Sequence, residues 1–159
     1  MNDIVKRSGK VAFYRVGDTY HRMKGFTEFT TKKSPIEYSR QYIDEEFKRN
    51  DIVGYDTSIS YAFDLIRDNA VHMDIVSVTD NEKTGESSIR NIVVADFTSG
   101  DEGGTSFSAI SRDFALIPDS EGESTDAYTY SGSLKVSGNL KKGTVTSTDN
   151  FETCTFTEV

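Results

Sequence analysis

The sequence predicts a mainly β fold: a β-sandwich or barrel of seven or eight strands with one flanking α-helix and a long inter-strand loop. Three observations favour this class. Apolar and polar residues alternate with a period of two in several segments, while only one segment has the period of an amphipathic helix. The composition, with 10 Phe and 8 Tyr against 2 Pro, favours packed strands over disorder. At 159 residues the chain has the size of one domain, so we predict that residues 1–159 form a single domain.

The N-terminal part begins with two predicted strands, at residues 11–16 and 25–31, with a turn signal at Gly17 between them. Residues 32–57 then lack any sustained period of two. A connection of about 25 residues is well beyond the usual loop length in a small domain. This segment combines many charges with four aromatic residues, which are costly to leave in water. We expect it to be functional or docked on a partner; a short surface helix is the alternative.

Regular structure resumes at residues 58–65, where strict alternation predicts the clearest half-buried strand of the chain. A helix is predicted next, over residues 69–79. Asp68-Asn69 offers an N-cap, and Val71, Ile75 and Val78 follow at the spacing of one helical face.

The remainder is predicted to be β-structure. We expect strands at residues 88–98, 105–118, 128–137, 144–148 and 151–159. The predicted connections are a glycine-rich turn at 100–104, an acidic loop at 119–126 and a turn at 141–143. In the last strand Cys154 and Phe156 share one face, so the cysteine is interpreted as a small buried apolar residue.

Charge is distributed unevenly along the chain. Residues 1–50 hold 11 Lys and Arg against 7 Asp and Glu, whereas residues 51–159 hold 7 against 19. The net charge of −8 and the pI near 4.8 argue against tight nucleic-acid binding, which needs clustered cations. The asymmetry raises the idea that identical copies meet, the basic part of one against the acidic part of another. The alternative is a solvated surface with unevenly spread charges.

We find no arrangement of residues that indicates catalysis. His21 and His72 are far apart and are interpreted as surface or packing residues. The acidic clusters at 44–46 and 119–126 lack the pattern of a calcium loop. The sequence therefore predicts a protein that is not an enzyme, with no cofactor and no metal. The polar N-terminus and the absence of a long apolar run predict no signal peptide and no membrane anchor.

Several stretches, taken in their order along the chain, carry a resemblance to a known family. They are GKVAFYRV (9–16), YHRMKGFT (20–27), SPIEYSRQYIDE (34–45), DIVGYDTSISY (51–61), DNAVH (68–72), FALIPDSEG (114–122) and DAYTYSG (126–132). Together they resemble the tail tube (major tail) proteins of tailed bacteriophages, in particular those of phages that infect Gram-positive bacteria. None of the stretches is a catalytic signature, so the specificity lies in their number and order.

The resemblance implies a small β-sandwich or barrel of which six copies close a ring, and rings that stack into a tube for DNA. A long loop typically reaches the neighbouring ring, and here residues 32–57 match it. The inter-subunit stacking residues implied by this match are Tyr38, Arg40, Tyr42, Asp44, Phe47, Lys48, Arg49 and Tyr55. The implied partners are further copies of the chain, the tape measure, tail terminator and distal tail proteins, and DNA only in transit. The implied location is the virion tail, assembled in the cytoplasm of the host bacterium.

A tube that passes DNA should have a lumen that repels phosphates, and the acidic balance after residue 50 agrees with this. The strands at 58–65 and 128–137 each have one polar face and are the candidates for the lumen, where we expect at least one acidic side chain. A plain, non-contractile tube is favoured. The alternatives are a subunit of a headless phage-tail-like particle, such as a bacteriocin-like particle or a type VI secretion tube, a monomeric β-sandwich binding module, and an enzyme of unknown type.

Overall fold

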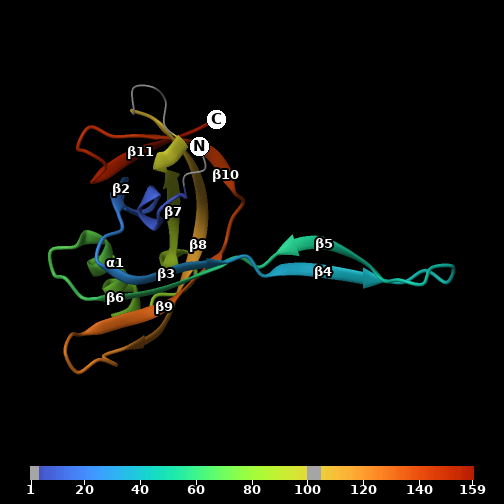
Figure 1. The fold of residues 1–159 in the computed structure, drawn as a ribbon. Helices are drawn as coiled ribbons and strands as arrows, with labels where there is room; N and C mark the ends of the chain where they lie inside the picture. Colours follow the sequence, from blue (N-terminus) through green and yellow to red (C-terminus); the bar gives the residue numbers. More distant parts are fainter. Residues whose placement is uncertain (1–3, 100–104) are drawn as a thin grey trace.

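The computed structural model describes residues 4–99 and 105–159, and within them the fold is mainly β, with eleven strands and one α-helix (Figure 1). The strands are β1 (Lys10–Val16), β2 (Thr19–Arg22), β3 (Phe26–Lys32), β4 (Pro35–Arg40), β5 (Arg49–Tyr55), β6 (Ser58–Asp64), β7 (Ile89–Asp96), β8 (Phe107–Glu121), β9 (Thr129–Val136), β10 (Lys141–Thr146) and β11 (Thr153–Glu158). The helix α1 (Ala70–Asp80) lies between β6 and β7, and three short 3-10 turns are η1 (Arg7–Gly9), η2 (Gly85–Ser88) and η3 (Phe97–Ser99). The turn predicted at residues 100–104 lies outside the described residues.

Nine strands form one sheet in the order β10-β11-β2-β1-β7-β8-β9-β6-β3. Strand β10 also pairs with β8, so the first six strands of this order close into a barrel. The long strand β8 links two parts of the sheet: its residues 108–115 pair with β7, and its residues 114–121 pair with β9. Beyond the barrel, β9, β6 and β3 extend the sheet. The predicted sandwich or barrel class with one helix is therefore confirmed.

The structure adds three strands to the seven or eight that were predicted. One is β2, a four-residue strand that follows the turn at Gly17, whose φ of +62° is the left-handed conformation that glycine favours. The other two, β4 and β5, lie inside residues 32–57, which form an antiparallel hairpin rather than a loop. The alternative of a surface helix there is wrong. The turn predicted at 141–143 is instead the start of β10, where Lys141 pairs with Ser111.

The helix is confirmed to within one residue at each end. The side chain of Asn69 caps it, since Oδ1 accepts hydrogen bonds from the backbone N–H groups of Val71 (3.0 Å) and His72 (3.2 Å). Asn69 also donates from Nδ2 to the carbonyl of Lys24 at 2.8 Å, which ties the start of α1 to the connection before β3. Val71, Ile75 and Val78 are fully buried, as their spacing predicted.

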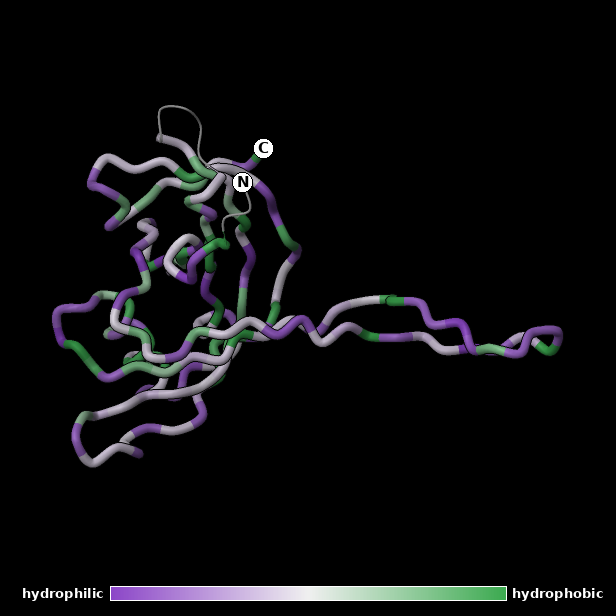
Figure 2. Tube along the Cα trace, viewed as in Figure 1, coloured by the Kyte–Doolittle hydropathy of each residue, from purple (hydrophilic) through white to green (hydrophobic). Residues whose placement is uncertain are grey.

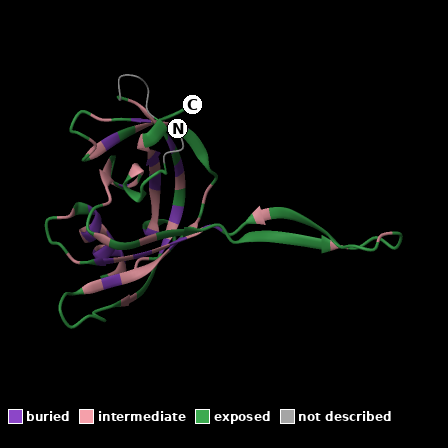
Figure 3. Cartoon of the chain, viewed as in Figure 1, coloured by how far each residue is buried: buried purple, intermediate pink, exposed green. Residues whose placement is uncertain are grey.

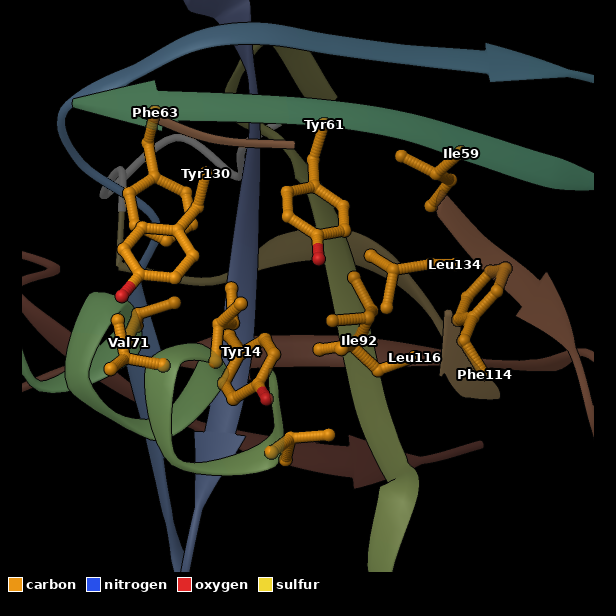
Figure 4. Close-up of a cluster of buried hydrophobic side chains, with 13 residues drawn as sticks. Tyr14, Ile59, Tyr61, Phe63, Val71, Ile92, Phe114, Leu116, Tyr130 and Leu134 are labelled. Carbon is orange, nitrogen blue, oxygen red and sulfur yellow. The ribbon is translucent and has the colours of Figure 1, made fainter. Parts of the chain in front are cut away.

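Hydrophobic residues gather in two cores in the main body, whereas the hairpin of β4 and β5 stands out from it (Figures 2 and 3). The barrel core contains Phe13, Val93, Ala95, Ala109, Val145 and Cys154. The second core lies between α1 and the sheet, and Figure 4 shows Tyr14, Ile59, Tyr61, Phe63, Tyr130 and Leu134 turned toward it. Burial alternates strictly along β6, so one face of this strand fills the second core and the other is left for the surface.

Candidate functional site

The most prominent feature of the surface is an arm, which we define as residues 35–55. Strands β3 and β6 of the main sheet lead directly into β4 and β5, and the arm projects far from the body (Figure 1). The junction is fixed by a hydrogen bond from the Asp56 N–H to the Ser34 carbonyl at 3.0 Å. Register runs from Pro35 opposite Tyr55 to Arg40 opposite Arg49. The arm is thus a separate two-stranded sheet that follows directly from β3 and β6, and not a loop.

The arm carries apolar side chains that the body does not cover. Eight of them are 49–107% exposed: Ile36, Tyr38, Tyr42, Ile43, Phe47, Ile52, Val53 and Tyr55. Figure 3 shows the exposure along both strands. A monomeric protein rarely leaves so many apolar side chains together in water, and such clusters mark protein–protein interfaces. The arm is therefore the leading candidate for a binding surface.

Two arginines order the distal half of the arm. The Arg40 guanidinium lies 5.4 Å from the ring centre of Tyr38 and 5.6 Å from that of Tyr42. It also donates to the Tyr42 hydroxyl at 2.9 Å and forms an ion pair with Asp51. Both hydrogen bonds raise the pKa of Arg40, which stays charged. These contacts hold the aromatic rings in place before any partner arrives, which lowers the entropic cost of binding.

Arg49 makes a second set of contacts at the tip. Its guanidinium lies 5.9 Å from the ring centre of Tyr42 and 5.6 Å from that of Phe47. Nε donates to the Glu45 carboxylate at 2.9 Å. The ring of Tyr42 therefore lies between Arg40 and Arg49, and the tip is a single cluster of cations and aromatic rings.

All eight residues predicted as stacking residues lie on the arm. The structure brings Tyr38, Arg40, Tyr42, Phe47 and Arg49 together in the distal cluster. The other three are apart from it, with Tyr55 at the base and Asp44 and Lys48 exposed at the tip; neither of these two takes part in an ion pair within the described part of the chain.

Sequence reasoning missed the aliphatic residues of the arm. Ile43 at the tip is fully exposed, at 107%, and Ile36, Ile52 and Val53 are more than half exposed. The signal was available, since these residues occur in the same segment that could not be placed in a compact domain.

A second candidate surface is the outer face of the sheet formed by β3, β6, β9 and the C-terminal part of β8. The polar faces predicted for residues 58–65 and 128–137 lie side by side, because β6 pairs with β9 along its whole length. Most of the side chains on this face are small: Thr30, Ser58, Ser60, Ala62, Ala115, Ser120, Thr129, Ser131 and Ser133. Ile117, which pairs with Ser133 and is 41% exposed, is a large apolar exception. The Ser120 and Ser131 hydroxyls are hydrogen-bonded at 2.7 Å. The result is a hydroxyl-rich surface with a hollow of about 370 Å³ over its centre.

Charged residues stand at the two ends of this polar face. Glu28 pairs with Ala62, so it lies near Asp64 at the end away from the arm. Lys32 and Lys135 both pair with Ser58, at the end next to the arm. The face is therefore acidic at one end, basic at the other and uncharged between them.

The residues that most often carry chemistry serve packing here. His72 is buried, and its ring stacks on that of Phe63 with 4.1 Å between the ring centres. Its Nδ1 accepts a hydrogen bond from the Ile66 N–H, and burial lowers the pKa of the imidazole. Burial raises the pKa of the Cys154 thiol to about 12, so it is no nucleophile at neutral pH. Within residues 4–99 and 105–159 no group of three or more His, Cys, Asp or Glu is placed to hold a metal ion, and none of the helices there is long and apolar enough to cross a membrane.

Comparisons with known proteins give a match only at the level of structure. No protein-family model matches the sequence, and no curated protein matches it. A chain in the structure of the six-fold symmetrised baseplate of the anti-feeding prophage is similar with a TM-score of 0.52 at 8% identity, over 89% of this chain and 97% of that one. A chain in the sheath/tube terminator structure of an extracellular contractile injection system, in its extended state, has a TM-score of 0.51 at 13% identity, over 89% and 97%.

A third similar chain belongs to the structure of the tube-terminating cap of the anti-feeding prophage, with a TM-score of 0.51 at 13% identity over 92% of this chain and 94% of that one. At these identities the likeness shows a common fold. The chain therefore has a fold that occurs in components of contractile, tail-like assemblies, and it covers nearly the whole length of the chains it resembles.

Proposed function

We propose that the protein is a structural subunit of a phage tail tube. Copies close into hexameric rings, rings stack into a hollow tube, and each arm reaches a copy in the adjacent ring. The observation that carries this proposal is the arm itself: eight apolar side chains stand exposed on a stiff hairpin that projects from the body. Burial of such side chains against another copy is worth about 1.5–3 kcal/mol for each one fully covered.

The polar sheet face supports a tube rather than an isolated binding module. A channel for DNA needs a wall without deep pockets or clustered cations that would hold the phosphates. The face of β3, β6, β9 and β8 offers mostly small hydroxyl and methyl groups over its centre, with Ile117 among them. Its charges lie at the two ends, with Glu28 and Asp64 at one and Lys32 and Lys135 at the other. We assign this face to the lumen. The expected acidic side chain of the channel would then be one of these two.

The contractile assemblies with similar chains favour a second version of the same function, in which the subunit belongs to a headless tail-like particle rather than to a virion of a phage of Gram-positive bacteria. Both versions require the same rings, stacking arm and lumen. In the virion version the further partners are the tape measure, tail terminator and distal tail proteins.

The arm can be removed without opening the core, which gives a direct test. Residues 34–56 would be replaced by Asn-Gly, a pair that forms tight two-residue hairpin turns. Thr57 is kept because it is buried. We expect this variant to melt as one cooperative unit like the full chain, but to form no tubes in negative-stain electron microscopy. Full-length protein at the same concentration is the control.

Three outcomes are informative. Tubes from the full chain and only rings or single particles from the variant would support the proposal. Tubes from both would mean that the arm does not stack the rings. A full chain that stays monomeric at high concentration and beside the neighbouring tail proteins would favour a monomeric binding module.

A further inference from the structure

The side of the domain between β1 and β3 is open. Strand β3 is the last strand of the sheet and, in the described structure, pairs only with β6. Across from it lies β1, and two adjoining hollows of about 520 and 640 Å³ run between the two strands. The first hollow is lined by the apolar Ala12 and Phe29 and by the cations Lys6, Arg7 and Lys10. The second adds one further cation, Arg22, and one carboxylate, Glu28, so cations are in excess along the groove. This groove therefore combines apolar and cationic side chains and is bounded by an unpaired strand.

Arg7 bridges the groove. Its Nη1 donates to the Lys10 carbonyl at 2.9 Å, at the start of β1, and its Nη2 donates to the Phe29 carbonyl of β3 at 3.1 Å. The second bond uses a backbone acceptor on the side of β3 that faces away from β6. Proteins protect exposed strand edges with charged side chains and covering loops, because an open edge can pair with another chain. Residues 5–10, which carry Arg7 across the groove, act in this way, and we refer to them as the cover.

A second unpaired edge lies at the opposite side of the same sheet. Pairing of β8 with β7 ends at Ala115, so within the described residues the segment 116–121 of β8 is paired only with β9, and η2, just before β7, contacts β8. This segment contains Pro118, which has no N–H to offer and is typical of edge strands. Asp119 and Glu121 are exposed there. One edge is therefore acidic, and the groove beside the other edge is basic.

We propose that the cover is displaced when copies assemble, and that the acidic β8 edge of a second copy takes its place beside β3. This inference rests on the proposed function, in which the sheets of neighbouring copies join within a ring. It adds the cover, the Arg7 bond that holds it, and the charged residues that select the partner. Entry of the strand exchanges the Arg7 bond to Phe29 for a bond from a backbone N–H. The cations of the groove then lie near Asp119 and Glu121 of the incoming strand, an arrangement that favours this partner over a neutral one.

Geometry makes the partner a second copy rather than the same chain. The two edges lie on opposite sides of the sheet, with β6 and β9 between them. Each copy therefore offers one edge of each kind, and the contact is head-to-tail. Such contacts give a ring when the rotation between successive copies closes, as the proposed function requires, and an open helical filament when it does not.

The cover is tested by Arg7→Ala, with Lys6→Ala as the matched control. Both variants lose one positive charge from the same segment, but only Arg7 is bonded to β3. The lowest concentration that gives rings or tubes would be measured by sedimentation, and the products identified by electron microscopy. We expect Arg7→Ala to assemble at about tenfold lower concentration than Lys6→Ala, because one charge-assisted bond no longer has to be broken. Equal or weaker assembly of Arg7→Ala would overturn the claim that the cover restrains assembly.

The incoming strand is tested by Asp119→Lys with Glu121→Lys, against Asp68→Lys with Glu158→Lys. All four residues are exposed, and each pair changes the net charge by the same amount. We expect the β8 pair to raise the concentration for assembly at least tenfold above that of the control pair. Its melting temperature should fall only slightly, through loss of the exposed hydrogen bond from the Tyr128 hydroxyl to Glu121. Equal assembly of the two pairs would overturn the role of the β8 edge while leaving the ring-forming function intact. Absence of assembly by the unaltered chain and by Arg7→Ala would overturn both.

Discussion

Ile43 at the tip of the arm provides a prediction in which assembly and folding are separated. Its side chain is 107% exposed, so it makes no contribution to the core of the single chain. We expect Ile43→Ser to change the free energy of unfolding by less than about 0.5 kcal/mol. If the tip is buried against another copy, the same change removes the burial of one aliphatic side chain. That burial is worth about 1.5–3 kcal/mol, which corresponds to roughly 10- to 150-fold in the association constant.

The measurement is the concentration at which half of the protein sediments as tubes, with thermal unfolding of the unassembled fraction beside it. Ile4→Ser is the matched control, because Ile4 is 91% exposed and lies outside the arm. We expect Ile43→Ser to need at least tenfold more protein than Ile4→Ser. Equal values for the two variants would refute burial of the tip. A lower melting temperature for Ile43→Ser alone would refute the separation of arm and core.

Three further predictions concern the body of the protein. A Cβ at Gly132 would lie 2.6 Å from the Ile117 carbonyl, so we expect Gly132→Ala to lower the free energy of unfolding in urea by about 1–3 kcal/mol. Gly54→Ala should leave it almost unchanged, because a Cβ there would make only an ordinary contact with Ile36, at 3.6 Å. Burial lowers the folded-state pKa of His72, so the unfolded chain binds more protons below about pH 6.5 and the free energy of unfolding should fall as the pH drops from 7 to 5.5; a flat profile would contradict this. Cys154 should resist a thiol reagent at pH 8 in the folded protein and react once urea unfolds the chain, and rapid reaction without urea would show that it is accessible.

Local patterns were sufficient for the elements that pack against the cores. Strand β6 and helix α1 were predicted because one face of each is buried, so their polar and apolar residues follow the period of the backbone. The arm has no buried face in the single chain. Its strands therefore carry no alternation to detect, and Ile52 and Val53 occur in succession with both side chains exposed. The sequence did show that residues 32–57 do not fit into a compact domain. The segment was therefore identified correctly, although its local structure is a hairpin and not the predicted loop.

The pairing of distant strands could not be predicted from local patterns. Closure of the barrel depends on β10 pairing with residues 107–111 of β8, at least 30 positions earlier in the chain. The predicted turn at 141–143 shows why: Lys141, Lys142 and Gly143 are typical of a turn, yet Gly143 lies where a side chain would clash with the Thr157 carbonyl, at 2.1 Å. Glycine is needed there for the close approach of two strands. The same residue type serves both purposes, and only the fold distinguishes them.

A subunit that polymerises must also remain soluble until it does so, and the two assembly surfaces meet this requirement differently. On the arm, Arg40 and Arg49 lie among the exposed apolar side chains. Their guanidinium groups lie over aromatic rings of Tyr38 and Tyr42, and this keeps positive charge at the surface of the distal cluster. The edge of β3 is held by Arg7 through a bond that an incoming strand can replace. Both devices use arginine, whose planar guanidinium offers several N–H donors at once. Assembly should then respond to ionic strength, since salt weakens the attraction between the basic groove and the acidic β8 edge while leaving the apolar contacts of the arm intact.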